Sequence, residues 1–222
     1  MHLSNDQASI LAESLSDKDR HRHQALVTPT ARETFLVSRV LLRSLLVSSL
    51  GRAAADIDFD EGPHGKPKLD GPLGSAHPIG FNVSHSPTHV LVGLSTRGEV
   101  GVDVETIRPY DDRLAERFFS PAEIRALQDL PPSQRGAGFF HLWVVKEACI
   151  KALGLPLGPT IASVAASLDN RGRHHTVEWE ALDAPPGTKA AIAVDLRDAA
   201  RPLARGVVRY ATLAELLPLP DP

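Results

Sequence analysis

The sequence predicts an α+β fold made of two similar halves that meet near residues 100 to 110. The main observation is that a helical pattern followed by short strands occurs twice along the chain. The length of 222 residues suits one large domain or two small ones. Hydrophobic residues make up 42% and charged residues 23% of the chain, as is ordinary for a folded globular protein. No clear residue-level repeat accompanies the repeated order, so the duplication is inferred from that order alone.

The first half opens with a long amphipathic helix. Thr30 and Glu33 stand at capping-box spacing, an apolar repeat follows them, and Gly51 supplies a stop. Residues 57–75 are rich in Gly, Pro and Asp, so we expect an irregular loop there. Beyond this loop the apolar period shortens to two. The pattern predicts a meander of three strands at residues 81–84, 89–94 and 100–105.

The second half repeats this order. Ser120, Pro121 and Glu123 combine a capping serine, a proline at the first helical position and a capping-box glutamate, so a helix begins there. Residues 139–153 predict another helix, which ends at Gly154 and is apolar nearly all round, as expected of a helix buried between layers. Short strands are predicted at residues 161–168, 176–182, 189–196 and 206–210.

Composition excludes several classes of protein. A net charge of -3 argues against a general nucleic-acid binder, which needs a basic face to displace counterions. The single cysteine, Cys149, can form no internal disulfide, which suits a reducing cytoplasm. The amino terminus lacks the basic and then apolar order of a signal peptide, and Arg43 interrupts the longest apolar stretch. We therefore expect a cytoplasmic protein without a membrane segment.

Two carboxylates share one face of the strand at residues 100–105. Alternation places Val102 and Val104 on one face, and Gly101, Asp103 and Glu105 on the other. Like charges this close repel each other unless a cation relieves them, and Mg²⁺ is commonly held by one or two carboxylates together with substrate phosphates. The alternative is an exposed strand edge with two solvated acids, since this spacing also occurs by chance.

The apolar helix at residues 139–153 carries three charged side chains, Lys146, Glu147 and Lys151. Glu147 and Lys151 are four residues apart and share a helical face. Burying a carboxylate without a partner is costly, so Glu147 is expected to face a metal ion or positive charge and to be a third acid of the site. The alternative is that the three residues line the one hydrated stripe of a packed helix.

Other residues indicate phosphate binding. His85 follows a predicted strand and is flanked by Ser84 and Ser86, a placement where a phosphate can bind, although such a histidine is usually only part of a turn. Residues 18–52 contain seven Lys or Arg against two acids, a local basic excess that implies a polyanion. Among these residues, Arg43 is notable because it lies within an apolar run.

Five segments from residue 65 to residue 151 resemble a known family, the larger, surfactin-synthetase-activating type of 4'-phosphopantetheinyl transferase. They have the order and spacing of the family's motifs and are Gly65-Lys66-Pro67, Phe81-Asn82-Val83-Ser84-His85-Ser86, Gly101-Val102-Asp103-Val104-Glu105, Arg117-Phe118-Phe119-Ser120 and Trp143-Val144-Val145-Lys146-Glu147-Ala148-Cys149-Ile150-Lys151.

The resemblance implies an enzyme that transfers the phosphopantetheine arm of coenzyme A to a serine of an apo acyl or peptidyl carrier protein and releases adenosine 3',5'-bisphosphate. It implies a pseudo-dimer whose halves, residues 1–102 and 103–222, enclose the active site in a cleft. Because one chain then supplies both halves of the cleft, we expect a monomer.

The resemblance also implies roles for individual residues. Asp103, Glu105 and Glu147 would hold Mg²⁺, for which Mn²⁺ can substitute, and Glu147 would also match the base for the carrier serine. Lys151 would lie beside the transferring phosphate. The implied contacts to coenzyme A are Arg43, Lys66, Ser84, His85, Lys146 and Lys151.

Two other functions stay open at this point. The same three acids can activate water, as in a Mg²⁺-dependent hydrolase of coenzyme A or nucleotides. A non-catalytic module that binds coenzyme A or a carrier is the other alternative. An apolar surface for the carrier is expected around the helix capped by Ser120, although the same side chains can instead belong to the core: Phe118, Phe119, Ile124 and Leu127.

Overall fold

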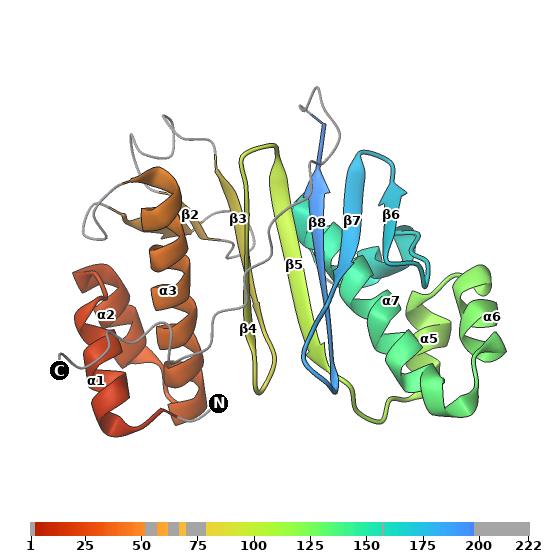
Figure 1. Cartoon of the computed structure of the whole chain (residues 1–222), viewed down its shortest axis with the longest axis horizontal. Coiled ribbons are helices and arrows are strands. Elements are labelled where there is room, and N and C mark those ends of the chain that lie inside the picture. Colours follow the sequence, from red (N-terminus) through yellow and green to blue (C-terminus); the bar gives the residue numbers. More distant parts are fainter. Residues whose placement is uncertain (1–2, 52–56, 62–66, 70–78, 157, 198–222) are drawn as a thin grey trace.

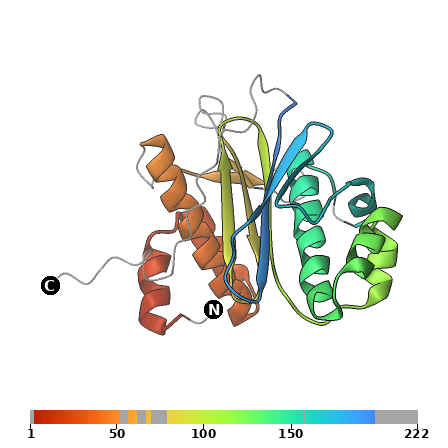
Figure 2. The ribbon, with the colours of Figure 1, turned by 45° about the vertical axis from the view of Figure 1, so that its right-hand side comes forward.

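The computed structural model describes residues 3–51, 57–61, 67–69, 79–156 and 158–197. Strands form the centre of the molecule, and the two longest helices cover its two sides, α3 (Pro29–Leu50) on one side and α7 (Pro132–Leu153) on the other (Figure 1). A view turned by 45° again shows the strands between these two helices (Figure 2). The predicted α+β fold of two halves, each with a long helix and strands, is confirmed.

The long helix of the first half is capped two residues earlier than predicted. Thr28 is the N-cap, its side chain accepts a hydrogen bond from the Ala31 amide at 3.2 Å, and Pro29 takes the first helical position. The predicted capping box was wrong, because Glu33 instead accepts the Leu3 amide from the start of the chain. The predicted end is confirmed: Gly51 adopts the left-handed conformation with φ of 61°.

Two short helices precede α3 and were not predicted. They are α1 (Asn5–Glu13), capped by Ser4, and α2 (Asp17–Ala25), capped by Ser16. Neither carries the apolar repeat that would identify it, and the residues of α2 are mostly charged or histidine. These two helices are therefore stabilised by packing against the rest of the protein rather than by an amphipathic sequence pattern of their own. Leu11 and Leu15 join one buried cluster with residues of α3, namely Leu36, Val37 and Val40.

The expected irregular segment at residues 57–75 contains a small sheet. β1 (Phe59–Glu61) and β2 (Pro67–Leu69) pair antiparallel. Phe59 and Leu69 are buried in the cluster below α3, and burial of these side chains explains why strands form in a segment rich in turn residues.

The three predicted central strands exist, but they do not form one meander. β3 (Gly80–His85) and β4 (Val90–Ser95) make a hairpin. β5 (Glu99–Thr106) instead pairs with β8 (Thr188–Asp195) in a sheet of order β5-β8-β7-β6. Alternation predicts that a segment is a strand, whereas its partner depends on distant residues. The predicted boundary at residue 102 falls inside β5 and stays a prediction.

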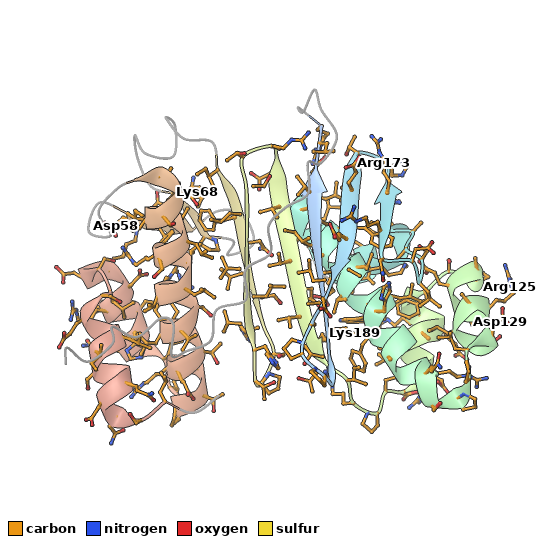
Figure 3. All side chains as sticks on the ribbon, in the orientation of Figure 1. Asp58, Lys68, Arg125, Asp129, Arg173 and Lys189 are labelled. Atoms are coloured by element: carbon orange, nitrogen blue, oxygen red, sulfur yellow. The ribbon has the colours of Figure 1, made fainter. Side chains whose placement is uncertain are left out.

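The second half contains three helices before its remaining strands. α5 (Asp112–Phe118) was not predicted, whereas α6 (Pro121–Asp129) has the predicted capping box between Ser120 and Glu123. The side chains of Arg125 and Asp129 point outward from α6 (Figure 3). α7 begins seven residues earlier than predicted, because its first two turns contain Gly136 and Gly138, which weaken the helical pattern.

Two of the four predicted later strands are confirmed, as β7 (Val177–Leu182) and β8. The predicted strand at residues 161–168 was wrong, because a 3₁₀ helix (Pro159–Ser163) occupies its first part and Lys146 bonds the carbonyl groups of Ile161 and Val164. β6 (Arg171–His174) was not predicted, and residues 206–210 lie outside the described residues.

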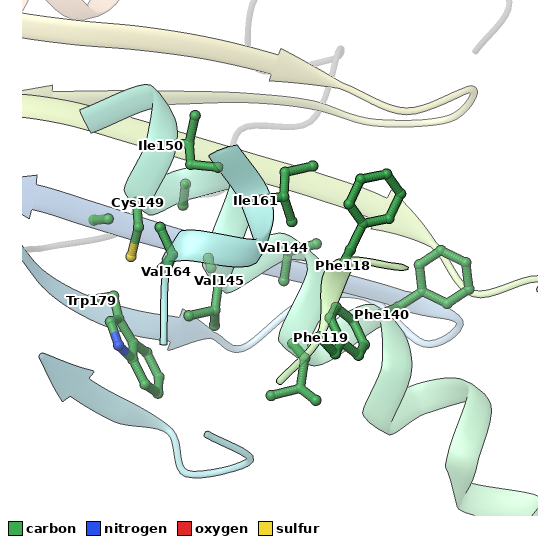
Figure 4. Packing of buried hydrophobic residues seen from close by; sticks show 14 of the residues in the cluster. Phe118, Phe119, Phe140, Val144, Val145, Cys149, Ile150, Ile161, Val164 and Trp179 are labelled. Carbon is green, nitrogen blue, oxygen red and sulfur yellow. The ribbon is translucent and has the colours of Figure 1, made fainter. Parts of the chain in front are cut away.

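The core of the second half is formed between α7 and the four-stranded sheet. Figure 4 shows how Phe118, Phe119 and Phe140 pack at one end of this cluster and Cys149 and Trp179 at the other. Leu127 is buried in it and Ile124 packs against it, so the side chains considered as a carrier surface belong mainly to the core. Within the described part of the chain, no helix is both long and apolar enough to cross a membrane.

Candidate active site

The site is built where β5 lies against α7. Gly101 faces this helix, and a Cβ atom added there would overlap the Ala148 carbonyl oxygen and the Ala152 amide nitrogen and lie 2.8 Å from Cβ of Lys151. Only a residue without a side chain permits this approach. The close contact brings the next inward-facing residue of β5, Asp103, to the side chain of Lys151. The predicted alternation is confirmed, since Val102 and Val104 pack on the opposite side with Leu91.

Asp103 is the most buried acid of the site, at 3% exposure. Its Oδ1 lies 2.6 Å from Nζ of Lys151 and accepts a hydrogen bond from the Ser84 hydroxyl at 2.8 Å. Its Oδ2 is buried and has no hydrogen-bond partner within the described part of the chain. One oxygen of this carboxylate is therefore held by two donors, while the other is left for a further ligand.

Lys151 joins the three elements that meet here. Its ammonium group donates to Asp103, to the Val102 carbonyl at 3.2 Å and to the Ser84 hydroxyl at 3.3 Å. It also lies 3.5 Å from Oε2 of Glu147, one turn earlier on α7. The side chain remains 18% exposed, so its charge is held in position without the residue being fully buried.

Glu147 is an acid whose charge the protein disfavours. The pKa of its carboxyl group is raised to about 7, mainly by burial and also by the nearby carboxylates of Asp103 and Glu105, against the lowering effect of Lys151. A group with a pKa near neutrality can gain or lose a proton at physiological pH. Perturbation of this kind is typical of functional carboxylates.

Glu105 faces a different cation. Its Oε2 lies 2.6 Å from Nη1 of Arg108, whose guanidinium also stacks on the ring of Phe140. Among the residues that the structure describes, no three His, Cys, Asp or Glu side chains are grouped closely enough to hold a metal ion. The expected three-acid metal centre is therefore not assembled in this conformation, although the three acids are near enough to influence one another.

Lys146 lies apart from the other predicted site residues. Its side chain is fully buried, pairs with Glu123 at 3.0 Å and donates to the carbonyl groups of Ile161 and Val164. Burial lowers the pKa of this ammonium group, and Glu123 opposes that effect. Because no part of the side chain reaches solvent, we remove Lys146 from the expected coenzyme A contacts and assign it to the interior of the second half.

The remaining predicted phosphate contacts are His85, Arg43 and Lys66. His85 is exposed at the end of β3. Arg43 is buried in the first half, where its guanidinium lies 2.8 Å from Asp19 and donates to the Ile57 carbonyl at 2.6 Å. Lys66 lies outside the described residues.

Two residues with clear structural roles were not singled out by the sequence. Asn82 is buried on β3, and its Oδ1 accepts the Val102 amide at 2.9 Å, which ties the hairpin to β5. Asp19 is buried between Arg39 at 3.1 Å and Arg43 at 2.8 Å. Asn82 stands two positions before Ser84, so strand alternation predicts that the two share a face. Nothing local distinguishes Asp19 among the charges of α2.

Comparison with known proteins agrees with this arrangement of two halves. Residues 3–96 match the family model of the 4'-phosphopantetheinyl transferase N-terminal region, and residues 99–194 match that of the 4'-phosphopantetheinyl transferase superfamily. The chain is also 31% identical over 198 residues to the 4'-phosphopantetheinyl transferase ffp of Bacillus subtilis, an alignment that covers 86% of each protein. The chain belongs to the 4'-phosphopantetheinyl transferase family.

Other members of this family show higher identity over shorter alignments. The chain is 39% identical over 143 residues to slr0495 of Synechocystis sp., covering 63% of this chain and 57% of that protein. It is 37% identical over 146 residues to the 4'-phosphopantetheinyl transferase HetI of Nostoc sp., covering 65% of this chain and 61% of HetI. The alignments with these two cyanobacterial proteins thus span less than two thirds of their length.

Proposed function

We propose that this protein transfers the 4'-phosphopantetheine arm of coenzyme A to a serine hydroxyl of an apo acyl or peptidyl carrier protein. Membership of the transferase family supports this function. The observation that carries it is the grouping of Glu147, Lys151 and Asp103, in which a carboxyl group with a pKa near neutrality adjoins a positioned ammonium group. A proton acceptor and a cation beside it are what attack by a neutral hydroxyl on a pyrophosphate requires.

The proposed reaction is a single displacement at phosphorus. The serine oxygen forms a bond to the phosphorus that bears pantetheine, and the bond from that phosphorus to the bridging oxygen breaks. Glu147 accepts the serine proton, directly or through a water molecule. Adenosine 3',5'-bisphosphate leaves with the bridging oxygen, and Lys151 stabilises the negative charge on the phosphoryl oxygens.

The residues of this site fit a divalent cation. Asp103 offers a buried oxygen that has no hydrogen-bond partner among the described residues. The pKa of Glu147 is raised first by burial and then by the carboxylates of Asp103 and Glu105, so an added positive charge would be favourable there. We propose that Asp103, Glu105 and Glu147 hold Mg²⁺, or Mn²⁺ in its place, which when bound neutralises charge on the pyrophosphate. Binding would compete with the partly exposed pair of Glu105 and Arg108, which contributes only about 0 to 1 kcal/mol.

We propose the contacts to coenzyme A from the resemblance to the family. We assign Lys151 to the transferring phosphate, Arg43 and His85 to the adenosine 3'-phosphate, and Lys66 to the nucleotide. We also propose that the protein acts as a cytoplasmic monomer, because one chain contains both halves of the site and its single cysteine is buried. Light scattering of the purified protein tests the oligomeric state.

Mass spectrometry tests the reaction. Apo carrier proteins are incubated with the protein, coenzyme A and Mg²⁺, and the expected result is a carrier heavier by one phosphopantetheine group, with an equal amount of adenosine 3',5'-bisphosphate. A chelator should stop the reaction, and added Mg²⁺ or Mn²⁺ should restore it. Release of the bisphosphate without any carrier would instead support a hydrolase, and binding without turnover would support a non-catalytic module.

A further inference from the structure

The hydroxyl group of Ser84 is buried and forms a hydrogen bond with Asp103, the most buried acid of the site. Ser84 is buried at 6% exposure, and its Oγ donates to Oδ1 of Asp103 at 2.8 Å. The same oxygen accepts a hydrogen bond from Lys151 at 3.3 Å. Both of these partners belong to the second half of the molecule, whereas Ser84 belongs to the hairpin of the first half.

This contact forms part of a polar seam between the hairpin and β5. In the described structure β3 pairs with β4 in a two-stranded sheet and makes no strand ladder with β5. Asn82 and Ser84 replace such a ladder with side-chain bonds, the first to the Val102 amide and the second to the Asp103 carboxylate. The backbone before Asp103 and the carboxylate itself are therefore both held from the same strand.

The seam determines which oxygen of Asp103 is available. Oδ1 is occupied by Ser84 and Lys151, so the carboxylate cannot rotate without breaking two hydrogen bonds. Oδ2 is buried, and no described residue donates a hydrogen bond to it. An unpaired buried carboxylate oxygen is unfavourable unless a ligand completes it, and a divalent cation is the ligand for which this acidic site is suited.

We propose that Ser84 is a positioning residue, which holds Oδ1 of Asp103 so that Oδ2 faces the divalent cation. This inference rests on the proposed function, and it replaces the expected contact between Ser84 and coenzyme A. A hydrogen bond of this kind to a metal-binding carboxylate is commonly worth about 10-fold to 100-fold in metal affinity. The effect of Ser84 should therefore appear in cation binding and not in the binding of coenzyme A itself.

The test measures Mn²⁺ binding to the full-length protein by electron paramagnetic resonance, with coenzyme A present and no carrier. Ser84→Ala should weaken Mn²⁺ binding by about 10-fold or more, while the dissociation constant for coenzyme A in chelator stays unchanged. Ser84→Thr keeps the hydroxyl group and should restore Mn²⁺ affinity. Unchanged Mn²⁺ affinity in Ser84→Ala, or coenzyme A binding weakened equally with and without the metal, would overturn the inference.

Ser86→Ala is the matched control. Ser86 is equally buried and stands two residues further along, and its hydroxyl group has no hydrogen-bond partner among the residues with described positions. Its removal should leave Mn²⁺ binding unchanged. If Ser84→Ala does not fold, Ser84→Cys is compared with Ser84→Thr instead. The thiol is similar in size to the hydroxyl group but is a poor hydrogen-bond donor, so Ser84→Cys should bind Mn²⁺ more weakly than Ser84→Thr.

The two proposals fail in different ways. A protein that binds Mn²⁺ in this Ser84-dependent manner but modifies no carrier would contradict the proposed transfer and leave the positioning of Asp103 intact. If the protein modifies carriers but wild type and Ser84→Ala bind Mn²⁺ with equal affinity, the proposed transfer stands and the inference about Ser84 is wrong. Absence of Mn²⁺ binding by the wild-type protein would overturn the inference about Ser84.

Discussion

Nζ of Lys151 lies 2.6 Å from Oδ1 of Asp103, although 48 positions separate the two residues in the chain. The contact joins α7 to β5 at the point where Gly101 lets their backbones approach. Among the residues that the structure describes, it is the shortest contact of this ammonium group, whose other acidic neighbour, Glu147, lies at 3.5 Å. The charge that we assign to the transferring phosphate is thus oriented mainly by Asp103.

Lys151→Met should strongly reduce transfer. The methionine keeps much of the apolar stem but removes the charge that stabilises the phosphoryl oxygens, so kcat/KM should fall by about 100-fold or more. Rates with a carrier protein and coenzyme A measure the loss, and circular dichroism checks the fold. Arg173→Gln, on exposed β6, serves as a control and should keep full activity. Activity of Lys151→Met near that of wild type would remove Lys151 from the mechanism.

Glu147→Gln should abolish transfer while the protein stays folded. The amide keeps the shape of the side chain but cannot accept the serine proton or bind a cation as a carboxylate does, so a loss of about 100-fold or more is expected. Steady-state rates at saturating coenzyme A measure the effect. Glu116→Gln, at an exposed position of α5, is the control. Full activity of Glu147→Gln would exclude Glu147 from both proposed roles.

Glu147 should also make the metal-free protein less stable as the pH rises. Its carboxyl group has a pKa of about 7 in the folded protein and an ordinary value of 4.5. Between these values the folded state binds more protons than the unfolded state, so the free energy of unfolding falls with rising pH, by at most about 3 kcal/mol. Glu147→Gln should lack this component.

Denaturant titrations in chelator at pH 5 and pH 8 measure the difference. Between the two values, wild type should lose more stability than Glu147→Gln, and the Glu116→Gln control should behave like wild type. Equal losses in wild type and Glu147→Gln would contradict a raised pKa for this group.

Gly101→Ala should disrupt the contact between β5 and α7. The added Cβ would overlap backbone atoms of Ala148 and Ala152, which cannot move like the end of a flexible side chain. Overpacking of this kind commonly costs about 1 to 3 kcal/mol, and the displacement of α7 should also lower transfer. Gly136→Ala, within α7 itself, is a matched control, because the nearest atom to its new Cβ outside the backbone of that helix is Cγ2 of Ile107, at 3.9 Å.

Thermal and denaturant unfolding compare the two glycine variants. Gly136→Ala should be neutral or slightly stabilising, since alanine favours a helix by about 0.5 to 1 kcal/mol over glycine. Equal stability of Gly101→Ala and wild type would show that the helix and strand can separate without cost.

Glu123→Ala should destabilise the second half. Glu123 pairs with the fully buried Lys146 and also accepts the amides of Ser120 and Ala166. Removal of one partner leaves a buried charge, at a cost of about 3 to 5 kcal/mol. The double variant Glu123→Gln with Lys146→Met should be more stable than the sum of its single variants predicts, as a double-mutant cycle by denaturation will measure.

The same variants test where Lys146 acts. If Lys146 belongs to the interior, a folded Lys146→Met protein should bind coenzyme A with unchanged affinity. Weaker binding of coenzyme A with unchanged stability would return Lys146 to the cofactor contacts.

The candidate site was predictable to the extent that it depends on local periodicity. Alternation along β5 placed Asp103 and Glu105 on the face opposite Val102, and the helical period placed Glu147 and Lys151 on one face of α7. The capping box at Ser120 was also predictable from the sequence, because all its atoms lie within four consecutive residues. The ends of α3 and α7 were harder, since each begins with a proline and lacks the expected pattern in its first turns.

Local sequence patterns define the kinds of chemical group in the site and the face of each element on which they lie. The partners of these groups follow from the folded arrangement: β5 joins β8, Glu105 faces Arg108, Ser84 holds Asp103, and Lys146 turns into the core toward Glu123. The physical reason is that side-chain direction follows from the backbone period over a few residues. The partner of a charge depends instead on which distant segments bury their apolar faces together.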